Sequence, residues 1–252
     1  MHTQHNGTEP ALTITGVHFA YSTQSVALND INVQIAAGER IGLIGPNGSG
    51  KTTLFLTICG ILKPTAGEVH LFGESVKVGG FRPEIGFVFQ NPNDQLFCPS
   101  VEEDVAFGPT NMGLPQDEVT TRVADAMETT GVSHLAQRAP HHLSGGEKRM
   151  VAIAGVLAMH PRLIIYDEPE ANLDSVARRR LIHFLQASHE TLILSSHDLE
   201  FVLEVCSRVI MIHKGQIVAD GLPRDVMGDA ALMEQYGLER PYSLMAERTA
   251  HT

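Results

Sequence analysis

An apolar run that leads straight into a glycine-rich segment with one lysine narrows the folds open to this chain. The run is Ile41–Ile44, the segment is GPNGSGKT at residues 45–52, and a helix-like stretch follows. The segment satisfies the pattern GxxxxGK followed by Ser or Thr, in the strand–loop–helix context that this pattern requires. Its glycines let successive N–H groups turn inward, and the helix adds the positive end of its dipole. The segment therefore predicts a phosphate-binding loop, or P-loop.

Two side chains of this loop are expected to act on a bound nucleotide. Lys51 supplies a positive charge to the β- and γ-phosphates, and Thr52 supplies a hydroxyl group to Mg²⁺. The residues expected to contact the nucleotide here are Asn47, Gly48, Ser49, Gly50, Lys51, Thr52 and Thr53. The alternative is a plain glycine-rich turn before a helix, and the apolar run before the loop argues against it.

Two carboxylates end a second apolar run. Asp167 and Glu168 follow Leu163–Tyr166, which predicts a strand that ends at the carboxyl edge of a sheet, where ligands of α/β proteins bind. Asp167 can hold Mg²⁺, whereas Glu168 points to the other side of the strand and can address a water molecule. Read alone, the pair is equally a polar strand end that caps the next helix. Together with the P-loop it predicts a nucleotide-hydrolysing site.

Two further segments carry polar groups suited to a phosphate. In LSGGE, residues 143–147, Ser144, Gly145 and Gly146 are expected at the start of a helix, where N–H groups are available to an anion. Glu147 closes that motif. His197 follows the run Leu192–Ser196, so at a strand end it can donate to a γ-phosphate and orient a water molecule. A common turn and a surface histidine are the alternatives.

Apolar patterning divides the rest of the chain. Alternation through residues 12–35 and GEVHLFG at 67–73 predict an N-terminal antiparallel sheet. Short apolar runs predict strands that are buried on both faces of a parallel sheet: 40–44, 163–166, 191–194 and 209–212. Helical segments separate most of them: 51–62, 147–159, 175–187 and 198–205. This alternation predicts an α/β fold with crossover helices.

Strand patterning is absent between about residues 91 and 160. Val119, Val123 and Met127 recur there at helical spacing, which predicts an inserted helical subdomain. We expect one domain over residues 11–240, with polar, flexible tails at 1–10 and 241–252.

Composition restricts the partners. The chain has 252 residues, with 18 Lys and Arg against 29 Asp and Glu, so its formal net charge is −11. Such a chain is poorly suited to bind nucleic-acid phosphates. It has no apolar run of the roughly 18–20 residues that a membrane span requires, and its first ten residues do not resemble a signal peptide. Its three cysteines form no CxxC pair, which predicts a reducing compartment.

Taken in order, GPNGSGKT, Gln90, LSGGE, Asp167-Glu168 and His197 resemble the nucleotide-binding domain of ABC ATPases, over about residues 12–222. The resemblance implies a P-loop NTPase of the α/β class, with a RecA-like core sheet, an N-terminal antiparallel β-subdomain and the inserted helical subdomain.

The resemblance also implies roles for three more residues. Tyr21 stacks on the adenine, Gln90 contacts Mg²⁺ and relays contact with the membrane partner, and Asp174 lines the dimer interface.

The resemblance implies a mechanism as well. Two ATP molecules lie head to tail between two chains, each between one P-loop and the partner's Ser144-Gly-Gly, most simply in a homodimer. A water molecule attacks the γ-phosphate, Glu168 is the general base, His197 orients, and Lys51 with Mg²⁺ stabilises charge.

A narrower resemblance lies in FQNPNDQLF, residues 89–97, and VEEDVAFGP, residues 101–109. Both are similar to the ATPase subunits of energy-coupling-factor importers, above all the cobalt and nickel branch. This implies that a coupling helix of the transmembrane subunit docks at Gln95, Leu96 and Phe97, and the alternative is a subdomain hinge with ordinary core residues. Two positions depart from the ABC pattern: Glu147 replaces the more usual Gln, and Glu170 replaces Thr or Ser.

The predicted function is therefore ATP hydrolysis that energises an importer for cobalt or nickel ions. The expected partners are a second ATPase subunit, a transmembrane coupling subunit and a substrate-binding membrane subunit, at the cytoplasmic face of the membrane, with no nucleic acid. A vitamin importer and a heterodimer remain alternatives. A soluble ABC ATPase of nucleic-acid repair or translation would usually carry a coiled-coil insertion or a second cassette, and a small-molecule kinase would not need LSGGE.

Overall fold

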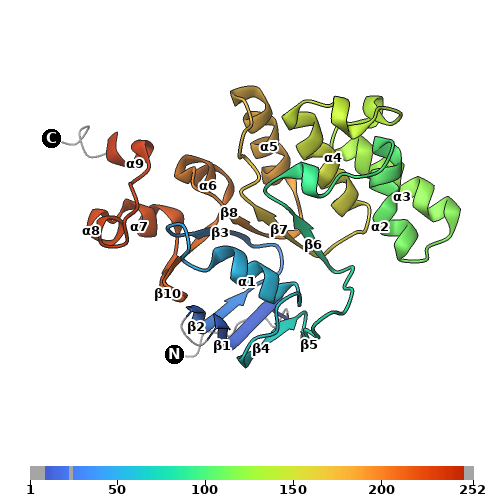
Figure 1. The fold of residues 1–252 in the computed structure, drawn as a ribbon. Helices are drawn as coiled ribbons and strands as arrows, with labels where there is room; N and C mark the ends of the chain where they lie inside the picture. The colour runs from blue at the N-terminus through green and yellow to red at the C-terminus, as the bar shows by residue number, and fades with distance from the viewer. Residues whose placement is uncertain (1–8, 23–24, 247–252) are drawn as a thin grey trace. The chain divides into compact units, whose positions relative to one another are not determined.

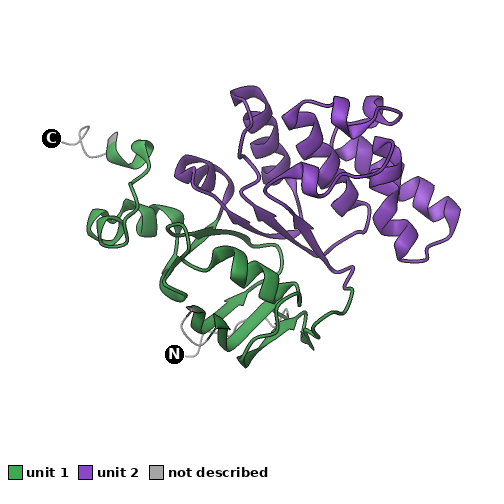
Figure 2. Cartoon of the chain, in the orientation of Figure 1, with its two compact units in different colours: residues 1–81, 207–252 green, residues 82–206 purple. Residues whose placement is uncertain are grey.

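The computed structural model describes residues 9–22 and 25–246. The chain divides into two compact units (Figure 2): unit 1 comprises residues 1–81 and 207–252, and unit 2 comprises residues 82–206. Among the helices of the described residues, none is both long enough and apolar enough to cross a membrane.

Unit 1 contains the predicted antiparallel sheet, with strand order β2-β1-β4-β5 (Figure 1). Alternate residues of β1, among them Leu12 and Ile14, are buried, as the period-2 pattern predicts. The bounds are β1 Leu12–Ser22, β2 Ser25–Ile35, β4 Ala66–Leu71 and β5 Glu74–Ser75.

A second group of strands in unit 1 holds the P-loop. Strand β3, Arg40–Ile44, pairs in parallel with β9, Arg208–His213, and helix α1, Lys51–Ile58, follows the loop. The predicted run at 209–212 lies in β9, parallel to β3 as expected. Strand β10, Gln216–Gly221, lies outside the predicted runs and pairs antiparallel with β9, so the sheet is mixed.

The C-terminal part of unit 1 contains three short helices, α7 Pro223–Gly228, α8 Ala230–Gln235 and α9 Tyr242–Ala246. Helix α9 lies in the segment expected to be a flexible tail. It is ordered because Leu244 is buried, with 7% of its surface exposed, and because Arg240 donates a hydrogen bond of 2.9 Å to the carbonyl of Leu244. Residues 1–8 and 247–252 of the two expected tails lie outside the described residues.

Unit 2 contains three parallel strands that end at a common edge. They are β6 Ile85–Val88, β7 Leu163–Asp167 and β8 Thr191–Ser195, and Tyr166 of β7 lies opposite Val88 and Leu194. The α/β character is therefore confirmed. The helices that follow β7 and β8 are α5 Ser175–Ala187 and α6 Leu199–Val205, as predicted to within one residue.

The stretch expected to be helical is helical. Its elements are α2 Val101–Asn111, α3 Gln116–Thr129 and α4 Gly145–Leu157, with 3-10 turns at Pro92–Asp94, Ser133–Leu135 and Pro140–His142. The three helices contact one another (Figure 1), and the side chains of Val119, Val123 and Met127 are buried on α3. Burial of that stripe explains the helical spacing seen in the sequence.

Candidate functional site

The P-loop owes its shape to three glycines with positive φ. Gly45, Gly48 and Gly50 have φ angles of 152°, 75° and 112°. A Cβ atom on Gly45 would lie 2.1 Å from the carbonyl oxygen of Ile212, and one on Gly50 would lie 2.6 Å from that of Ala27. At Gly45 and Gly50 a side chain is excluded by both the backbone angle and the lack of space, whereas at Gly48 the positive φ alone favours glycine.

The N-terminus of α1 remains open to an anion. Its N-cap residue, Gly50, offers no side chain, and no side-chain hydrogen bond caps the helix. Close by, the hydroxyl group of Ser49 is buried and finds no hydrogen-bond partner among the described residues. Asn47 and Gly48 lie on the exposed part of the loop. Helix N–H groups and a spare hydroxyl group form the donor set that a phosphate requires.

Lys51 lies across this loop. Its side chain is buried, and Nζ donates to the carbonyl oxygens of Gly45 at 2.8 Å and Pro46 at 3.1 Å. These bonds hold the ammonium group on the loop. Thr52, the next residue of α1, is exposed.

Tyr21 is anchored to the same helix. Its hydroxyl group lies 3.2 Å from Oγ1 of Thr53, and its ring packs edge-on against Phe19 with 4.9 Å between centroids. Since 61% of Tyr21 remains exposed, the ring is held in place but is still available to stack on a planar group.

In unit 2, the two carboxylates occupy the end of β7. The Oδ1 atom of Asp167 accepts a hydrogen bond of 2.6 Å from the hydroxyl group of Ser195. Glu168 has a positive φ of 46°, and its N–H lies 3.1 Å from both the carbonyl and the hydroxyl oxygen of Ser195. This φ lies in the left-handed region, where a non-glycine residue is strained, and such strained residues are frequent at functional sites.

Glu168 is the centre of a three-residue cluster. Its Oε2 accepts a hydrogen bond of 2.5 Å from Nε2 of Gln90, and its Oε1 lies 2.9 Å from Nε2 of His197. The three residues follow β6, β7 and β8, and the common edge of these strands brings them together. The carboxylate is 19% exposed and the imidazole 44%, so water can reach a group able to accept a proton.

The LSGGE motif forms the start of α4. Ser144 is the N-cap residue, and it forms a capping box with Glu147, in which the Ser144 N–H donates to Oε2 at 2.8 Å. That backbone hydrogen bond lowers the pKa of Glu147. The box uses the N–H groups of Ser144 and Glu147, and those of Gly145 and Gly146 lie outside it. Glutamine could accept the same bond, so Glu147 keeps the function of the usual residue.

Replacing Ser144 by Ala is expected to lower the free energy of unfolding by about 1 kcal/mol, because the helix loses its N-cap acceptor. Urea unfolding without ATP measures this. Ser175→Ala is the matched control, since Ser175 is the first residue of α5 and Asp174 caps that helix. Equal urea midpoints for Ser144→Ala and the unchanged chain would contradict the expectation.

Two residues predicted to meet partner chains also have roles within unit 2. Asp174 caps α5 by accepting a bond of 2.8 Å from the N–H of Ala177. Gln95 accepts from the N–H of Phe89 at 3.2 Å and donates to the carbonyl of Ala152 at 3.3 Å, so its side chain fastens the loop.

Phe97 does face solvent. It is 64% exposed and packs edge-on against Phe107, which is 48% exposed, with 4.8 Å between ring centroids. Leu96 is half-buried beside it. We call Phe97 and Phe107 the aromatic pair, and Phe107 is a residue that the sequence did not single out, although it lies in the segment 101–109.

Arg149 is a residue beside the Glu168 cluster that the sequence did not single out. It is 1% exposed, and its two terminal nitrogens donate to the carbonyl oxygens of Phe89 and Gln90, both at 2.5 Å. Burial lowers its pKa to about 10, while the charge of Glu170 opposes that shift. The sequence around Arg149 does not reveal these contacts, because the partners are backbone carbonyl oxygens of residues 60 and 59 positions earlier in the chain.

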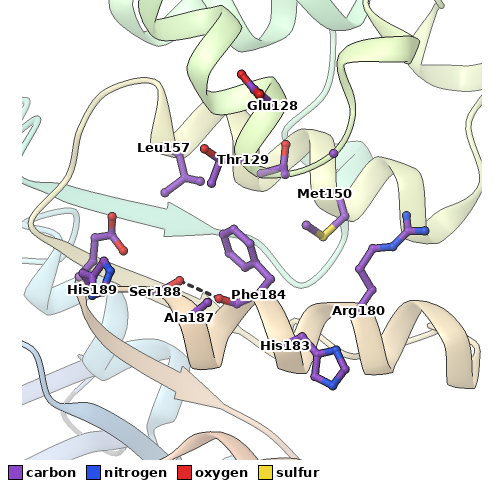
Figure 3. Close-up of a pocket in the computed structure, with 13 residues that line it drawn as sticks. Glu128, Thr129, Met150, Leu157, Arg180, His183, Phe184, Ala187, Ser188 and His189 are labelled. Atoms are coloured by element: carbon purple, nitrogen blue, oxygen red, sulfur yellow. Dashed lines mark hydrogen bonds between the residues drawn. The ribbon is translucent and has the colours of Figure 1, made fainter.

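Two cavities of unit 2 differ in their relation to these residues. One of about 490 Å³ is bounded by residues that include Gln90, Gly145 and Asn172, so it lies beside the Gln90 loop and the start of α4. Figure 3 shows the other, of about 500 Å³, with Met150 and Phe184 in its apolar wall. None of the residues lining this second cavity is among those predicted to contact ATP.

Comparison with known proteins identifies the family. The ABC transporter family model matches residues 28–171. A putative ABC transporter ATP-binding protein of Synechocystis is 58% identical over 93% of this chain and 83% of that protein. The energy-coupling factor transporter ATP-binding protein EcfA of Methanothermobacter thermautotrophicus is 48% identical over 88% of this chain and 74% of that protein.

A solved structure agrees. The structure of cbiO1 from Clostridium perfringens, described as part of the ABC transporter complex cbiONQ, superposes with a TM-score of 0.82 at 35% identity. The match covers 96% of this chain and 100% of that one. Together with the P-loop and the carboxylate cluster, these likenesses show that the chain belongs to the ABC transporter family and is an ATP-hydrolysing ABC ATPase.

Proposed function

We propose that this chain is the ATP-hydrolysing subunit of an energy-coupling-factor importer, and that it forms one ABC ATPase domain over residues 11–240. One observation carries the proposal. The loop that begins at Gln90, whose amide contacts Glu168, reaches the exposed aromatic pair seven residues later at Phe97. A single short segment thus joins the hydrolytic carboxylate to a surface suited to another protein. The likeness to EcfA and cbiO1 supports this assignment.

Hydrolysis is proposed to use Glu168 as the general base. Its carboxylate is held from two sides by Gln90 and His197, so it is oriented to take a proton from a water molecule that attacks the γ-phosphate. His197 orients the attacking water. Lys51 is proposed to leave the two P-loop carbonyls and neutralise the phosphate charge.

The side chains assigned to Mg²⁺ fit that ion chemically. Thr52, Gln90 and Asp167 all offer oxygen atoms, which Mg²⁺ prefers, and few protein ligands are needed when phosphates supply the others. Since Gln90 donates to Glu168 through Nε2, its carbonyl oxygen is the atom suited to the ion. When bound with ATP, the ion would neutralise part of the phosphate charge.

The proposed assembly is a head-to-tail homodimer, with a heterodimer as the alternative. Each P-loop with its Tyr21, Asn47 and Gly48 would meet the Ser144-Gly-Gly segment of the second ATPase subunit, and the exposed Asp174 would lie near that interface. The N–H groups of Gly145 and Gly146, outside the capping box, are the donors proposed to reach the other chain's ATP. Binding of ATP would close the dimer and hydrolysis would open it.

The remaining partners are proposed to be a transmembrane coupling subunit and a substrate-binding membrane subunit, with the ATPase on the cytoplasmic face of the membrane. Cobalt or nickel is the proposed cargo, since residues 89–109 resemble that branch of importers, and a vitamin is the alternative. Uptake assays would distinguish the two kinds of cargo. Cells that express the importer subunits would be given radioactive cobalt or nickel and, in parallel, labelled vitamins.

Changing both Leu96 and Phe97 to Asp is expected to reduce uptake about tenfold or more, because two charges would face the membrane subunit across an apolar contact. ATP hydrolysis by the isolated subunit should stay within about twofold, since neither side chain contacts Glu168, and loss of a contact surface does not alter proton transfer. Transport and ATPase rates are measured on the same preparations.

The matched control is the double change of Ile61 and Phe81 to Asp. These two side chains are 57% and 65% exposed, comparable with Phe97, but lie in unit 1 outside the proposed contact. Unchanged uptake after the Leu96 and Phe97 changes, or an equal loss in the control, would refute the docking surface.

A further inference from the structure

Glu170 is a half-buried carboxylate at a position where the ABC pattern usually has Thr or Ser. Its Oε1 accepts a hydrogen bond from the hydroxyl group of Ser196. Its Oε2 is buried and finds no hydrogen-bond partner within the part of the chain that the structure describes. Burial raises the pKa of Glu170. A Thr or Ser side chain could bond to Ser196 without desolvating a charge, so the carboxylate needs another reason.

Arg149 is a buried residue of opposite charge in the same unit. This guanidinium is 1% exposed, and the charge of Glu170 opposes the lowering of its pKa by burial. Its Nε atom is buried without a hydrogen-bond partner among the described residues. A buried charge with no opposite charge to offset it would be costly, and the charge of Glu170 acts on this guanidinium.

Each charge holds a different loop. The terminal nitrogens of Arg149 hold the carbonyls of Phe89 and Gln90. Glu170 holds Ser196, whose hydroxyl oxygen also accepts from the N–H of Asp198 at 2.9 Å, so the turn around His197 is fixed. Gln90 and His197 are the two side chains that contact Glu168. Arg149 therefore fixes the loop that carries Gln90, and Glu170 fixes the turn that carries His197.

We propose that Glu170 is a positioning residue which, together with Arg149, fixes the loops of Gln90 and His197 so that both side chains hold Glu168 for proton transfer. The proposal rests on the proposed function, in which Glu168 is the general base. Glu170 itself touches neither ATP nor water in this mechanism. Its effect should therefore appear in the rate of hydrolysis and not in the affinity for ATP, because displacing a base by about 1 Å can cost roughly 10²-fold in rate.

The test compares Glu170→Gln, Arg149→Met and the double variant in the full-length chain. Glu170→Gln keeps an oxygen acceptor for Ser196 and removes only the charge. We expect kcat to fall about tenfold, with KM for ATP within about twofold. The double variant should lose no more than the worse single variant, because the two residues act through one another. Glu234→Gln on α8, at an exposed position, is the matched control.

The rates are expressed per ATP-binding site and accompanied by urea unfolding, which separates positioning from stability. If Glu170→Gln fails to fold, the double variant, which buries neither charge, should fold and should still show the low kcat. The proposal is overturned if Glu170→Gln or the double variant folds and has a kcat within twofold of that of the unchanged chain. It is also overturned if the fold loss of kcat in the double variant equals the product of the losses in the two single variants. Glu168→Gln is measured beside them. If it keeps turnover, the proposed base is wrong, and if it loses turnover while Glu170→Gln does not, only the positioning role is wrong.

Discussion

Glu168→Gln is expected to leave ATP binding intact and to lower kcat by about 10²–10⁴-fold. The amide has the shape of the carboxylate but cannot take a proton from water. In the unchanged chain, Oε1 of Glu168 lies 2.9 Å from His197 and Oε2 lies 2.5 Å from Gln90. The glutamine side chain has one oxygen, so it can accept a hydrogen bond from only one of these two partners. The strained backbone at Glu168, with φ of 46°, is retained in the variant, so the loop should keep its path.

Phosphate release under saturating ATP measures the rate, and equilibrium binding of a fluorescent ATP analogue measures affinity. Glu234→Gln makes the same chemical change at an exposed position of α8 and should leave both quantities unaltered. If Glu168→Gln retained its turnover, the general base would have to be another group.

Lys51→Ala is expected to weaken ATP binding about 10- to 100-fold. A hydrogen bond to a charged group contributes about 1.5–3 kcal/mol, and the ammonium group would contact two phosphates at once. In the structure Nζ donates to the carbonyl oxygens of Gly45 and Pro46, and we expect bonds to phosphate oxygens, which are charged, to be stronger than these. Truncation removes the positive charge from a loop whose other donors are neutral N–H and hydroxyl groups.

Titration of the variant with ATP gives the dissociation constant directly. Lys63→Ala is the matched control, because Lys63 is an exposed lysine a few residues beyond the end of α1. A dissociation constant equal to that of the unchanged chain would remove the P-loop from ATP binding.

Local elements of the fold were predictable from the sequence. Helix α5 lies at Ser175–Ala187 as expected, and β3 at Arg40–Ile44 as expected. Helix α4 begins at Gly145, two residues earlier than its helix-forming residues suggest, because Ser144 caps it. These elements depend on neighbours along the chain, such as caps, glycines and periodic apolar residues, and such signals can be read from the sequence.

Other elements depend on distant partners. Strand β6, Ile85–Val88, has only four residues, too few for periodicity to show, and it becomes a strand through its pairing with β7. Strand β10 likewise forms on β9, and the short helix α9 is held by burial of Leu244. Neither β10 nor α9 was predicted, and α9 occupies residues 242–246 of the segment expected to be a flexible tail.

The sequence by itself determined the chemistry of this protein: a P-loop with Lys51, a strand that ends in Asp167 and Glu168, and the LSGGE motif belong to an ATPase. Only the tertiary structure decided that Gln90 and His197 both contact Glu168. It also decided that Arg149 is buried and bonds to the backbone of Gln90, and that Glu170 bonds to Ser196. The motifs are local because each phosphate contact needs a few adjacent residues. The side chains around Glu168 are positioned by three strand ends, which are adjacent in the sheet but far apart in the sequence. Burial of a charged side chain likewise leaves no local pattern in the sequence.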